Sequence, residues 1–577
     1  MKVLVISGGS GNDALIKGLK NYYNSIDVKV LVNAYDNGKS TGVCRSLTDT
    51  LGVSDVRKNH IRMYKAMTSN QNRCFIEFYE ERYDFIPGYE LIEIKQKLKS
   101  WNLETLIPYA EEFFQNDDVA SYNFRDFNVS NIIYSQMYKS LGYEETNKYF
   151  CSLLGIDDFV ILNSFDNVFI QAVTASDKVI ADEGDIVEYC NSSDPIADIQ
   201  YVGQCNNCLN SQAIEAIIDA DYIVISTGTF WSSIYPTLQY GKLYQYINNS
   251  AAKKVWALNN TEDKDAFGVG CDDFINRLVK LGLNLNDFTL LINNDATDLL
   301  RQTNAPYKTV YSSMGNHNGK HDSNLYAREI LAIYYGLDST QIYDRYLFDF
   351  DDTLWSRKYT EDPQEGYFSL NNIERLNLLS GRENITIVSG NSFESIYSKL
   401  VLQFGHQLSD FNVDLWADAN CNHYHKTTIV DSIDDLFITD EANIIVWYLE
   451  GIYGILPAVN DEDNVAYVKI KPIYDTTSRK ILVDYLNDYL LQELGCDSCI
   501  ARLTGSTTVD ILNKSNSKSK VFDKICSKQD RTLYIGDELD EGNDSDIAKL
   551  CTHSIHTSGV EETNCVIKLI EEISNNR

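Results

Sequence analysis

Apolar segments that end in glycine, hydroxyl or acidic residues recur along this chain and alternate with segments of helical periodicity. The first covers residues 2–7 and runs into a glycine-rich turn, and others end near residues 226, 258, 349, 389 and 537. A strand buried on both faces is a continuous apolar run, and the carboxyl ends of parallel strands meet at one edge of a sheet. The pattern therefore predicts an α/β fold with doubly wound, Rossmann-like parallel sheets that bind ligands along those strand ends.

The length of 577 residues exceeds what one hydrophobic core supports, so we expect two or more domains. A helix predicted over residues 325–336 ends at a glycine, and a short polar segment over residues 337–341 follows it. We therefore expect one domain over residues 1–341 and a second over residues 342–577.

A formal net charge of −33 argues against a nucleic-acid partner or an anionic membrane, because phosphates must be neutralised by an excess of cations. The first eight residues are too short and too glycine-rich for a signal peptide, and residues 444–459 are too short to span a bilayer. The 13 cysteines are scattered, and the C-x-x-C pairs at residues 205–208 and 496–499 each lack a partner pair, which favours coincidence over zinc. These features predict a cytoplasmic protein with reduced thiols.

Asp349 and Asp351 stand in the run Asp-Phe-Asp-Asp-Thr, which apolar residues precede and follow. At the end of a buried strand, two acids spaced i, i+2 can divide the chemistry: Asp349 attacks a phosphoryl group, and Asp351 passes a proton to and from the leaving or entering oxygen. A divalent cation is then needed. The alternative interpretation is an acidic loop without chemistry, because such loops are common in a chain this anionic.

Three later segments, in order, favour phosphoryl chemistry. Ser389 ends the apolar segment 385–388, and its hydroxyl can bond a phosphate oxygen. Lys518 can neutralise the phosphoryl group and the nucleophile. Residues 533–544 carry an apolar strand into a turn rich in carboxylates, which suits Mg²⁺ because this ion prefers hard oxygen ligands.

These four segments together resemble the haloacid dehalogenase superfamily over roughly residues 343–577. The resemblance implies a Mg²⁺-dependent reaction in which Asp349 is the nucleophile, Asp351 is the acid and base, and Ser389 and Lys518 hold the phosphate. It implies metal ligation by Asp349, Asp351, Asp537 and Asp544. Asn543, and the acids Asp540 and Glu541, leave open which residue is the second metal contact of the last segment.

The long stretch between Ser389 and Lys518 resembles the large α/β cap of the branch that contains sugar phosphatases and phosphomannomutase, and we expect this cap over about residues 427–506. A mutase must grip the distal phosphate of a bisphosphorylated intermediate with fixed cations in the cap. Among many acids, the cap carries only the cations Lys469, Lys471, Arg479, Lys480 and Arg502. The composition therefore favours a phosphatase that acts on a small phosphorylated metabolite or sugar phosphate.

In the first half, the glycine-rich turn at residues 8–11 precedes a predicted helix over residues 14–23. Glycines let a backbone approach a ligand closely, and a helix N-terminus offers N–H groups to an anion. A second strand, over residues 28–33, leads to a polar loop that holds Asp36. The Gly-Lys-Ser-Thr sequence at residues 38–41 is not a Walker A motif, because Asn33 occupies the position of its first glycine. The turn after residue 226 also has the composition of a phosphate cradle.

The order of these loops, with the segments at residues 54–57, 130–131, 220–236 and 259, resembles the 2-phospho-L-lactate transferase family, especially relatives known as gluconeogenesis factors that bind UDP-sugars. The resemblance covers residues 1–337 apart from a helical insertion at residues 70–121. It implies a site for a nucleoside diphosphate or nucleotide sugar, with Asp36 for a metal or polar contacts and Asn131 and Asn259 for the base or sugar. The implied nucleotide-binding residues are Gly8, Gly9, Ser10, Gly11, Asp36, Arg57, Asn131, Gly228, Ser232, Ser233 and Asn259.

The first half also departs from that family. Asn37 stands where the family has its second acid, Lys39 and Ser130 stand where it has glycines, and Val43 stands where it has an arginine, so nucleotide binding is favoured over catalysis.

We expect a bifunctional enzyme, in which a phosphotransferase-like domain is fused to a Mg²⁺-dependent phosphatase. The rival hypothesis makes the first domain a UDP-sugar sensor that regulates the second.

Overall fold

The computed structural model describes residues 1–8, 11–203, 205–315, 317–357, 366–368, 370–404, 412–459, 463–471, 473, 475–504, 508–540 and 544–575. The chain forms two compact units, Met1–Asp338 and Ser339–Arg577, so the division falls inside the polar segment expected to be a linker. None of the helices in these described ranges combines the length and the apolarity that a bilayer crossing needs.

A seven-stranded sheet forms the centre of the first unit, in the order β10-β9-β8-β7-β1-β2-β3, and all its neighbours are parallel. The strands are β1 (Lys2–Ile6), β2 (Asp27–Val32), β3 (Val160–Leu162), β7 (Tyr222–Ile225), β8 (Lys253–Ala257), β9 (Phe288–Asn293) and β10 (Thr309–Ser312). The direction of winding reverses between β1 and β7, which is the switch point where such sheets bind ligands. The predicted doubly wound α/β fold is confirmed for this unit.

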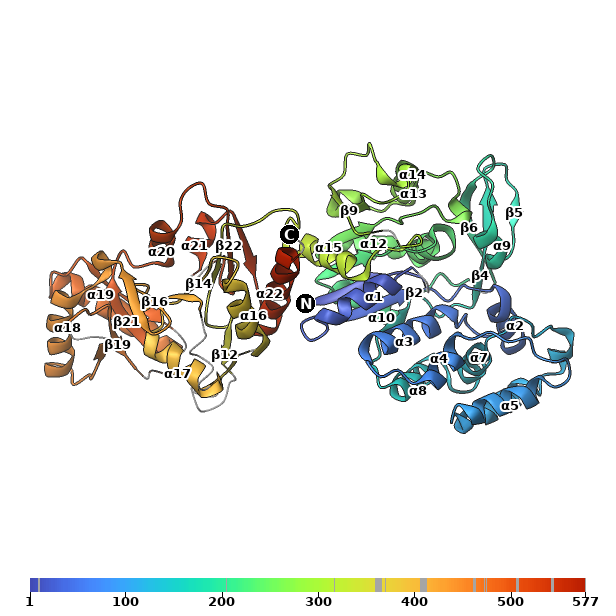
Figure 1. Ribbon diagram of the computed structural model, residues 1–577, viewed down its shortest axis with the longest axis horizontal. Coiled ribbons are helices and arrows are strands. Elements are labelled where there is room, and N and C mark those ends of the chain that lie inside the picture. Colours follow the sequence, from blue (N-terminus) through green and yellow to red (C-terminus); the bar gives the residue numbers. More distant parts are fainter. Residues whose placement is uncertain are drawn as a thin grey trace. The chain divides into compact units, whose positions relative to one another are not determined.

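Helices pack on this sheet (Figure 1). The helices α10 (Ser211–Asp219), α12 (Leu243–Asn249) and α13 (Cys271–Leu281) share a buried cluster with Leu4 and Ile6 of β1. The helices α1 (Asp13–Leu19), α3 (Ser54–Met67) and α15 (Ser323–Tyr335) are linked because α1 packs against both α3 and α15. Asp322 caps α15 by accepting the N–H groups of Asn324 and Leu325 at 3.0 Å, and Gly336 ends it in the left-handed region that favours glycine.

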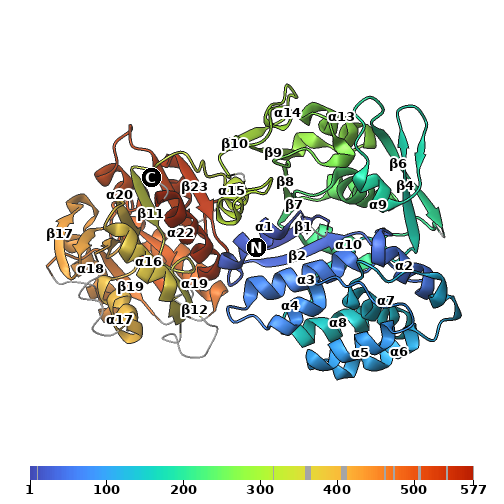
Figure 2. The same ribbon diagram turned by 45° about the vertical axis from the view of Figure 1, so that its right-hand side comes forward.

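The first unit has two insertions in addition to its central sheet. The first consists of helices that follow the second strand. These are α2 (Lys39–Thr48), α4 (Arg73–Glu80), α5 (Glu90–Ser100), α6 (Ile107–Phe113), α7 (Val129–Leu141) and α8 (Tyr143–Leu154). Of these, α4, α5 and α6 lie within the helical insertion predicted over residues 70–121. A small antiparallel sheet, which the sequence pattern did not indicate, consists of β5 (Val179–Ile180), β4 (Val168–Thr174) and β6 (Ile196–Gly203). The short helix α9 (Glu183–Glu188) follows β5 and contacts β4, and both views show the two together (Figures 1 and 2).

The second unit has its own seven-stranded sheet, in the order β17-β16-β15-β14-β11-β22-β23. Its parallel part comprises β15 (Asp414–Ala417), β14 (Ile385–Val388), β11 (Arg345–Phe348), β22 (Thr532–Gly536) and β23 (His553–His556). The outer strands β16 (Asn422–His425) and β17 (Thr428–Ser432) run antiparallel to their neighbours, because short turns join them, and Lys426 in one turn has a φ of 59°. The sheet is therefore mixed, with a parallel core. Its helices are α16 (Leu370–Ser380), α17 (Phe393–Phe404), α20 (Lys518–Ile525), α21 (Ser545–Leu550) and α22 (Val560–Asn575).

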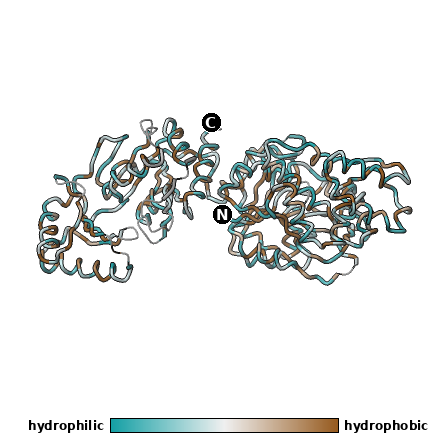
Figure 3. Tube along the Cα trace, turned by 90° about the horizontal axis from the view of Figure 1, so that it is seen from below, coloured by the Kyte–Doolittle hydropathy of each residue, from teal (hydrophilic) through white to brown (hydrophobic). Residues whose placement is uncertain are grey.

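A separate antiparallel sheet and two helices form the cap between β17 and α20. The strands follow the order β18 (Ala458–Val459), β19 (Tyr467–Ile470), β21 (Thr508–Asn513) and β20 (Cys499–Thr504). Helices α18 (Thr439–Gly451) and α19 (Thr476–Gln492) share a buried apolar cluster with this sheet. The cap expected over residues 427–506 thus differs at both ends, because β17 belongs to the core sheet and β21 extends the cap to Asn513. Figure 3 shows apolar stretches inside each unit and polar ones along outer loops.

Candidate functional site

Three neighbouring strands of the second unit end in the residues expected to do phosphoryl chemistry. Asp349 follows β11, Ser389 follows β14, and Asp537 follows β22. The backbone N–H of Asp349 donates to Ile535 O of β22 at 2.8 Å, which fixes the register of the two strand ends. Lys518 is the first residue of α20, and it reaches the same edge of the sheet.

Lys518 joins two carboxylates in the interior. Its Nζ donates to Asp349 Oδ1 and, at 2.5 Å, to Asp544 Oδ1, and it lies 3.3 Å from the Tyr534 hydroxyl. The side chains of Lys518, Asp349 and Asp544 are 7%, 10% and 2% exposed. A Cβ at Gly536 would lie 2.2 Å from Asp544 Oδ2, so only glycine at the end of β22 leaves room for this carboxylate. The ammonium is thus held in place by two buried acids.

Burial and charge shift the pKa values of this cluster in opposing ways. Burial raises the pKa of Asp349 well above its ordinary value, Lys518 opposes that shift, and Asp544 adds to it. Burial alone would lower the pKa of Lys518, but Asp349 and Asp544 outweigh it and raise the pKa. Burial also raises the pKa of Asp537 to about 6, and Asp544 contributes. The carboxylates of Asp349, Asp537 and Asp544 are neutralised only in part, because the Lys518 ammonium is the one cation that contacts them among the described residues.

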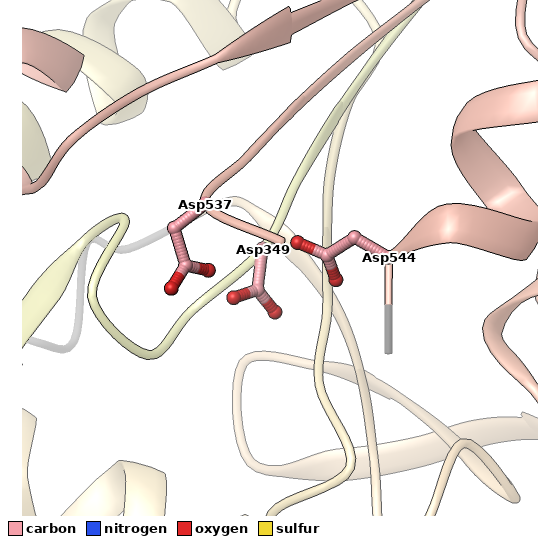
Figure 4. A group of neighbouring side chains, drawn as sticks. All are labelled: Asp349, Asp537 and Asp544. Atoms are coloured by element: carbon pink, nitrogen blue, oxygen red, sulfur yellow. The ribbon is translucent and has the colours of Figure 1, made fainter. Parts of the chain in front are cut away.

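The donor set fits a hard divalent cation. Carboxylate oxygens of Asp349, Asp537 and Asp544 lie within 4.8 Å of one another. Figure 4 shows Asp349 between the other two, with the three carboxylates turned toward a common space. Oxygen donors of this kind, with an excess of negative charge, suit Mg²⁺. Among the alternatives for the last segment, Asp544 belongs to this group, Asp540 is exposed, and Glu541 and Asn543 lie outside the described residues.

Asp351 bonds to side chains outside this carboxylate group. Its carboxylate is outside the group of three, and Asn391 Nδ2 donates to its Oδ2 at 2.6 Å while Lys399 Nζ lies 3.6 Å from its Oδ1. The chain turns sharply after it, because Asp352 has a φ of 50° and Leu354 N–H donates to Phe350 O at 2.9 Å. Asp351 is half-exposed and lies apart from the three carboxylates, and its expected roles as acid, base and metal ligand stay predictions.

Ser389 is buried beside the contact between Asn391 and Asp351. Its hydroxyl accepts the N–H of Asn391 at 3.1 Å, and its own N–H donates to Trp416 O at 2.9 Å. Because the hydroxyl oxygen accepts from the loop, its proton is able to bond a phosphate oxygen. Asp349, Asp351, Ser389 and Lys518 are thus brought to one edge of the sheet.

In the first unit, the loops after β1 and β7 interlock at the switch point. A Cβ at Gly11 would lie 1.9 Å from Thr227 O, and a Cβ at Gly8 would lie 2.3 Å from Ser233 Oγ. Gly228 N–H donates to Asn259 Oδ1 at 3.1 Å, and Asn259 Nδ2 returns a bond to Gly228 O at 3.0 Å. The hydroxyls of Ser232 and Ser233 meet Thr229 Oγ1 at 2.7 and 2.9 Å. These expected ligand-binding residues are therefore neighbours, whereas Gly9 and Ser10 lie outside the described residues.

The remaining expected residues gather at the end of β2. Asp36 Oδ1 accepts the N–H of Gly38 at 2.9 Å, and Asn131 Nδ2 donates to Ser40 Oγ at 2.9 Å. The buried Arg57 donates to Tyr79 O of α4, so part of its guanidinium anchors the helical insertion. Burial lowers the pKa of Arg57 to about 10, which leaves it charged at neutral pH.

Two carboxylates near Asp36 complete this region and were absent from the expected site. Glu183 of α9 hydrogen-bonds Asp36, and its backbone N–H donates to Asn37 Oδ1 at 3.0 Å. Asp55 of α3 is buried, with Lys58 Nζ 3.5 Å from its Oδ1. Burial, and then the charge of Asp36, raise the pKa of Glu183 to about 9, so this carboxyl holds a proton at neutral pH. No local sequence signal marks Glu183, because α9 and its small sheet bring it from a distant part of the chain.

A small pocket adjoins Gly228 at the ends of β7 and β8. Phe230, Trp256 and Phe274 are among its apolar walls, and Asn259 and Asp263 are among its polar groups. Asn259 Nδ2 donates to Asp263 Oδ2 at 2.8 Å. Burial raises the pKa of Asp263 to about 6, and Asn259 opposes this shift. Apolar and aromatic walls with a few polar groups are the usual lining of a small-molecule site.

A family match covers most of the first unit. The family described as 2-phospho-L-lactate transferase CofD matches residues 3–333. A Clostridium acetobutylicum protein named "Putative gluconeogenesis factor" is 21% identical over 309 residues, which are 52% of this chain and 58% of that protein. This chain therefore spans little more than half the length of that relative.

Two solved structures are similar at low scores. A Bacillus halodurans protein aligns with a TM-score of 0.45 and 16% identity, over 57% of this chain and 98% of its own. A Plasmodium falciparum IMP-nucleotidase aligns with a TM-score of 0.30 and 15% identity, over 44% of this chain and 75% of its own.

Proposed function

Because the match over residues 3–333 covers more than half of it, the chain belongs to the 2-phospho-L-lactate transferase CofD family, and we propose that it is a cytoplasmic enzyme with two active units. The first unit binds a nucleoside diphosphate or nucleotide sugar in a phosphotransferase-like site. The second unit is a haloacid dehalogenase-type, Mg²⁺-dependent phosphatase for a small phosphorylated metabolite or sugar phosphate. The observation that carries the second assignment is the Lys518 ammonium held between the buried carboxylates of Asp349 and Asp544.

The residues of the second unit supply the nucleophile and the proton-transfer group for a balanced two-step reaction. In the first step an Asp349 oxygen bonds to phosphorus, the ester P–O bond breaks with its electron pair, and protonated Asp351 gives its proton to the leaving oxygen. In the second step a water bonds to phosphorus, Asp351 takes the water's proton, and the bond between phosphorus and Asp349 breaks. Asp349 and Asp351 are thereby restored.

Three further side chains of the second unit, those of Lys518, Ser389 and Asn391, assist this reaction. Lys518 neutralises part of the charge that an anionic phosphate meets at Asp349, and Ser389 donates to a phosphoryl oxygen. Asn391 orients Asp351, because its amide donates to one carboxylate oxygen at 2.6 Å. Mg²⁺, when bound by Asp349, Asp537 and Asp544, supplies further stabilisation of charge on the phosphoryl oxygens.

The cap supports hydrolysis over phosphate relocation. Lys469 Nζ lies 3.5 Å from Asp510 Oδ2, and Arg502 donates to the backbone oxygens of Asn516 and Lys514 at 2.8 and 3.3 Å. Two of the few cap cations are therefore already engaged by the protein. A mutase needs such cations for a second phosphate.

Phosphate release tests this function. The full chain should hydrolyse p-nitrophenyl phosphate and sugar monophosphates with Mg²⁺, and EDTA should stop the reaction. With hexose 1-phosphates, free phosphate should appear faster than the 6-phosphate isomer, and the reverse order would assign a mutase. No Mg²⁺-dependent release from any of these esters would refute the phosphatase assignment.

A second candidate for the first unit is a UDP-sugar sensor, which the role of Asn37 favours. Asn37 replaces an acid of the family, and its side chain instead accepts the backbone N–H of Glu183. A sensor requires that a nucleotide sugar changes the phosphatase rate without being consumed. Measuring phosphate release and nucleotide-sugar concentration in the same reaction separates the two candidates, because an enzyme consumes its nucleotide ligand.

A further inference from the structure

A lysine of α17 lies against the loop that carries Asp351. Lys399 Nζ lies 3.6 Å from Asp351 Oδ1, and the lysine side chain is 13% exposed. The same ammonium lies 5.2 Å from the ring centres of both Phe350 and Trp355. Burial of an ammonium is unfavourable unless other groups replace its water, and here a carboxylate and two aromatic rings do so. The proposed reaction gives this cation no role.

The turn after Asp351 is one that its backbone disfavours. Asp352 has a φ of 50°, a region that residues with a side chain rarely adopt. Trp355 N–H donates to Phe350 O at 2.9 Å, and Asp352 N–H donates to Trp355 O at 2.6 Å. Phe350 and Trp355 thus form the two ends of the turn. Because the Lys399 ammonium attracts both of their rings, it stabilises the closed turn.

The carboxylate of Asp351 is held at both of its oxygens. Asn391 Nδ2 donates to Oδ2 at 2.6 Å, while Lys399 faces Oδ1. Since each oxygen has its own partner, rotation of the carboxylate is restricted, although the side chain stays half-exposed. A proton donor must lie within hydrogen-bond reach of the leaving oxygen, and a small displacement from that position lowers the rate strongly. The contact with Lys399 therefore bears on proton transfer.

We propose that Lys399 is a positioning residue, which holds Asp351 where its carboxyl gives a proton to the leaving oxygen. This inference rests on the proposed phosphatase function, with Asp351 as the proton donor. A p-nitrophenolate ion leaves without a proton, a phenolate ion leaves less readily, and an alkoxide ion needs the proton most. Loss of Lys399 should therefore matter more for poorer leaving groups. An ammonium that acted on the phosphoryl group itself would affect all esters alike.

Kinetics with graded leaving groups test the proposal. Lys399→Met removes the charge and keeps an apolar side chain of similar length. Its kcat/KM should fall less than about threefold for p-nitrophenyl phosphate, more for phenyl phosphate, and about tenfold or more for glycerol 3-phosphate. Lys399→Arg keeps the charge and should recover most of that loss. Lys524→Met is the matched control, because Lys524 pairs with Asp431 in an exposed contact of 3.1 Å, and its kcat/KM values should stay native.

A double variant tests whether Lys399 acts through Asp351. Release of phenol from phenyl phosphate is measured in a single turnover, with enzyme in excess. In the presence of Asp351→Asn, the change Lys399→Met should lower this rate no further, because the carboxyl that it positions is already lost. A further loss as large as in the native chain would mean that Lys399 acts independently of Asp351, and would overturn the proposal.

The remaining outcomes also decide. Equal losses for all three esters, or no loss for phenyl phosphate and glycerol 3-phosphate, would overturn the inference alone. If the native chain hydrolyses only the aryl esters, p-nitrophenyl phosphate and phenyl phosphate give the comparison by themselves. Lys399→Gln keeps the test valid if Lys399→Met fails to fold. No hydrolysis of any ester by the native chain would overturn the proposed function, and this inference with it.

Discussion

Each unit gathers carboxylates at the carboxyl ends of its parallel strands, but the two clusters balance their charge differently. In the second unit, Lys518 contacts both Asp349 and Asp544 in the interior. In the first unit, Glu183 meets Asp36 and keeps a proton, while Lys58 is 3.5 Å from Asp55. The fixed Lys518 ammonium lowers the negative charge that an anionic phosphate would meet. The charge of the first cluster instead changes with pH and with ligand binding, because Glu183 can lose its proton. Carboxylates at the ends of parallel strands therefore do not imply the same chemistry in the two units.

The largest expected effect follows from removing the fixed cation. Lys518→Met should lower kcat for phosphate release by about 10³-fold, because it removes a charge that acts on the phosphoryl group. It should also destabilise the second unit by about 3–5 kcal/mol, because two buried carboxylates lose their partner. Steady-state kinetics and urea unfolding measure the two effects.

Lys524→Met on the same helix is the matched control for that variant. Lys524 lies 3.1 Å from Asp431 in an exposed ion pair, which contributes at most about 1 kcal/mol. If Lys518→Met kept native activity, the charge balance ascribed to the second unit would be wrong.

A smaller effect is expected at the switch point of the first unit. In Gly11→Ala the added Cβ would overlap Thr227 O, so the loop must move and the affinity for a nucleotide or nucleotide sugar should fall at least tenfold. Phosphate release by the second unit should persist. Isothermal titration and the phosphatase assay check both statements. Gly270→Ala is the control, because its Cβ meets neighbours at an ordinary 3.5 Å. Equal affinity in Gly11→Ala and the native chain would place the ligand elsewhere.

The smallest effect concerns the proton on Glu183. Its pKa rises from 4.5 to about 9 in the folded unit, so the folded state binds more protons than the unfolded state between these values. The free energy of unfolding should therefore fall as pH rises through this window, and Glu183→Gln should weaken that dependence. The change should stay below about 1 kcal/mol per pH unit, because this carboxyl is half-buried and partly screened.

Urea unfolding of the fragment 1–338 in EDTA, at pH 5, 7 and 9, measures this dependence. Asp185→Asn changes an exposed acid of the same helix and should leave the slope unaltered. A stability of the native fragment that rises with pH across the window would reverse the sign and contradict the proton assignment.

Most of the core topology, and the positions of the residues proposed for phosphoryl chemistry, follow from the sequence pattern, because both depend on strand ends. The apolar runs before Asp349, Ser389 and Asp537 predict neighbouring parallel strands, and the sheet order places them together. The spacing of Asp349 and Asp351 predicts a shared loop. It does not reveal the turn at Asp352, which moves the second acid away from the carboxylate cluster.

Other parts depend on contacts between distant segments. Glu183 reaches Asp36 only because the small antiparallel sheet positions α9, and this sheet has no strong local pattern. Lys469 and Asp510 become partners through the register of β19 and β21. Their sequence neighbours show only alternating apolar residues, so this pair could not be predicted without the fold.

Phosphate release by two asparagine variants tests the separation of the two sites most directly. The full chain, Asp349→Asn and Asp36→Asn are compared with Mg²⁺ and a small phosphoester, and thermal unfolding confirms that each variant is folded. Asp349→Asn should release no phosphate, because an amide cannot act as the nucleophile, whereas Asp36→Asn should release it within about twofold of the native rate. Full Mg²⁺-dependent release by Asp349→Asn, or its loss in Asp36→Asn without added nucleotide, would contradict the account.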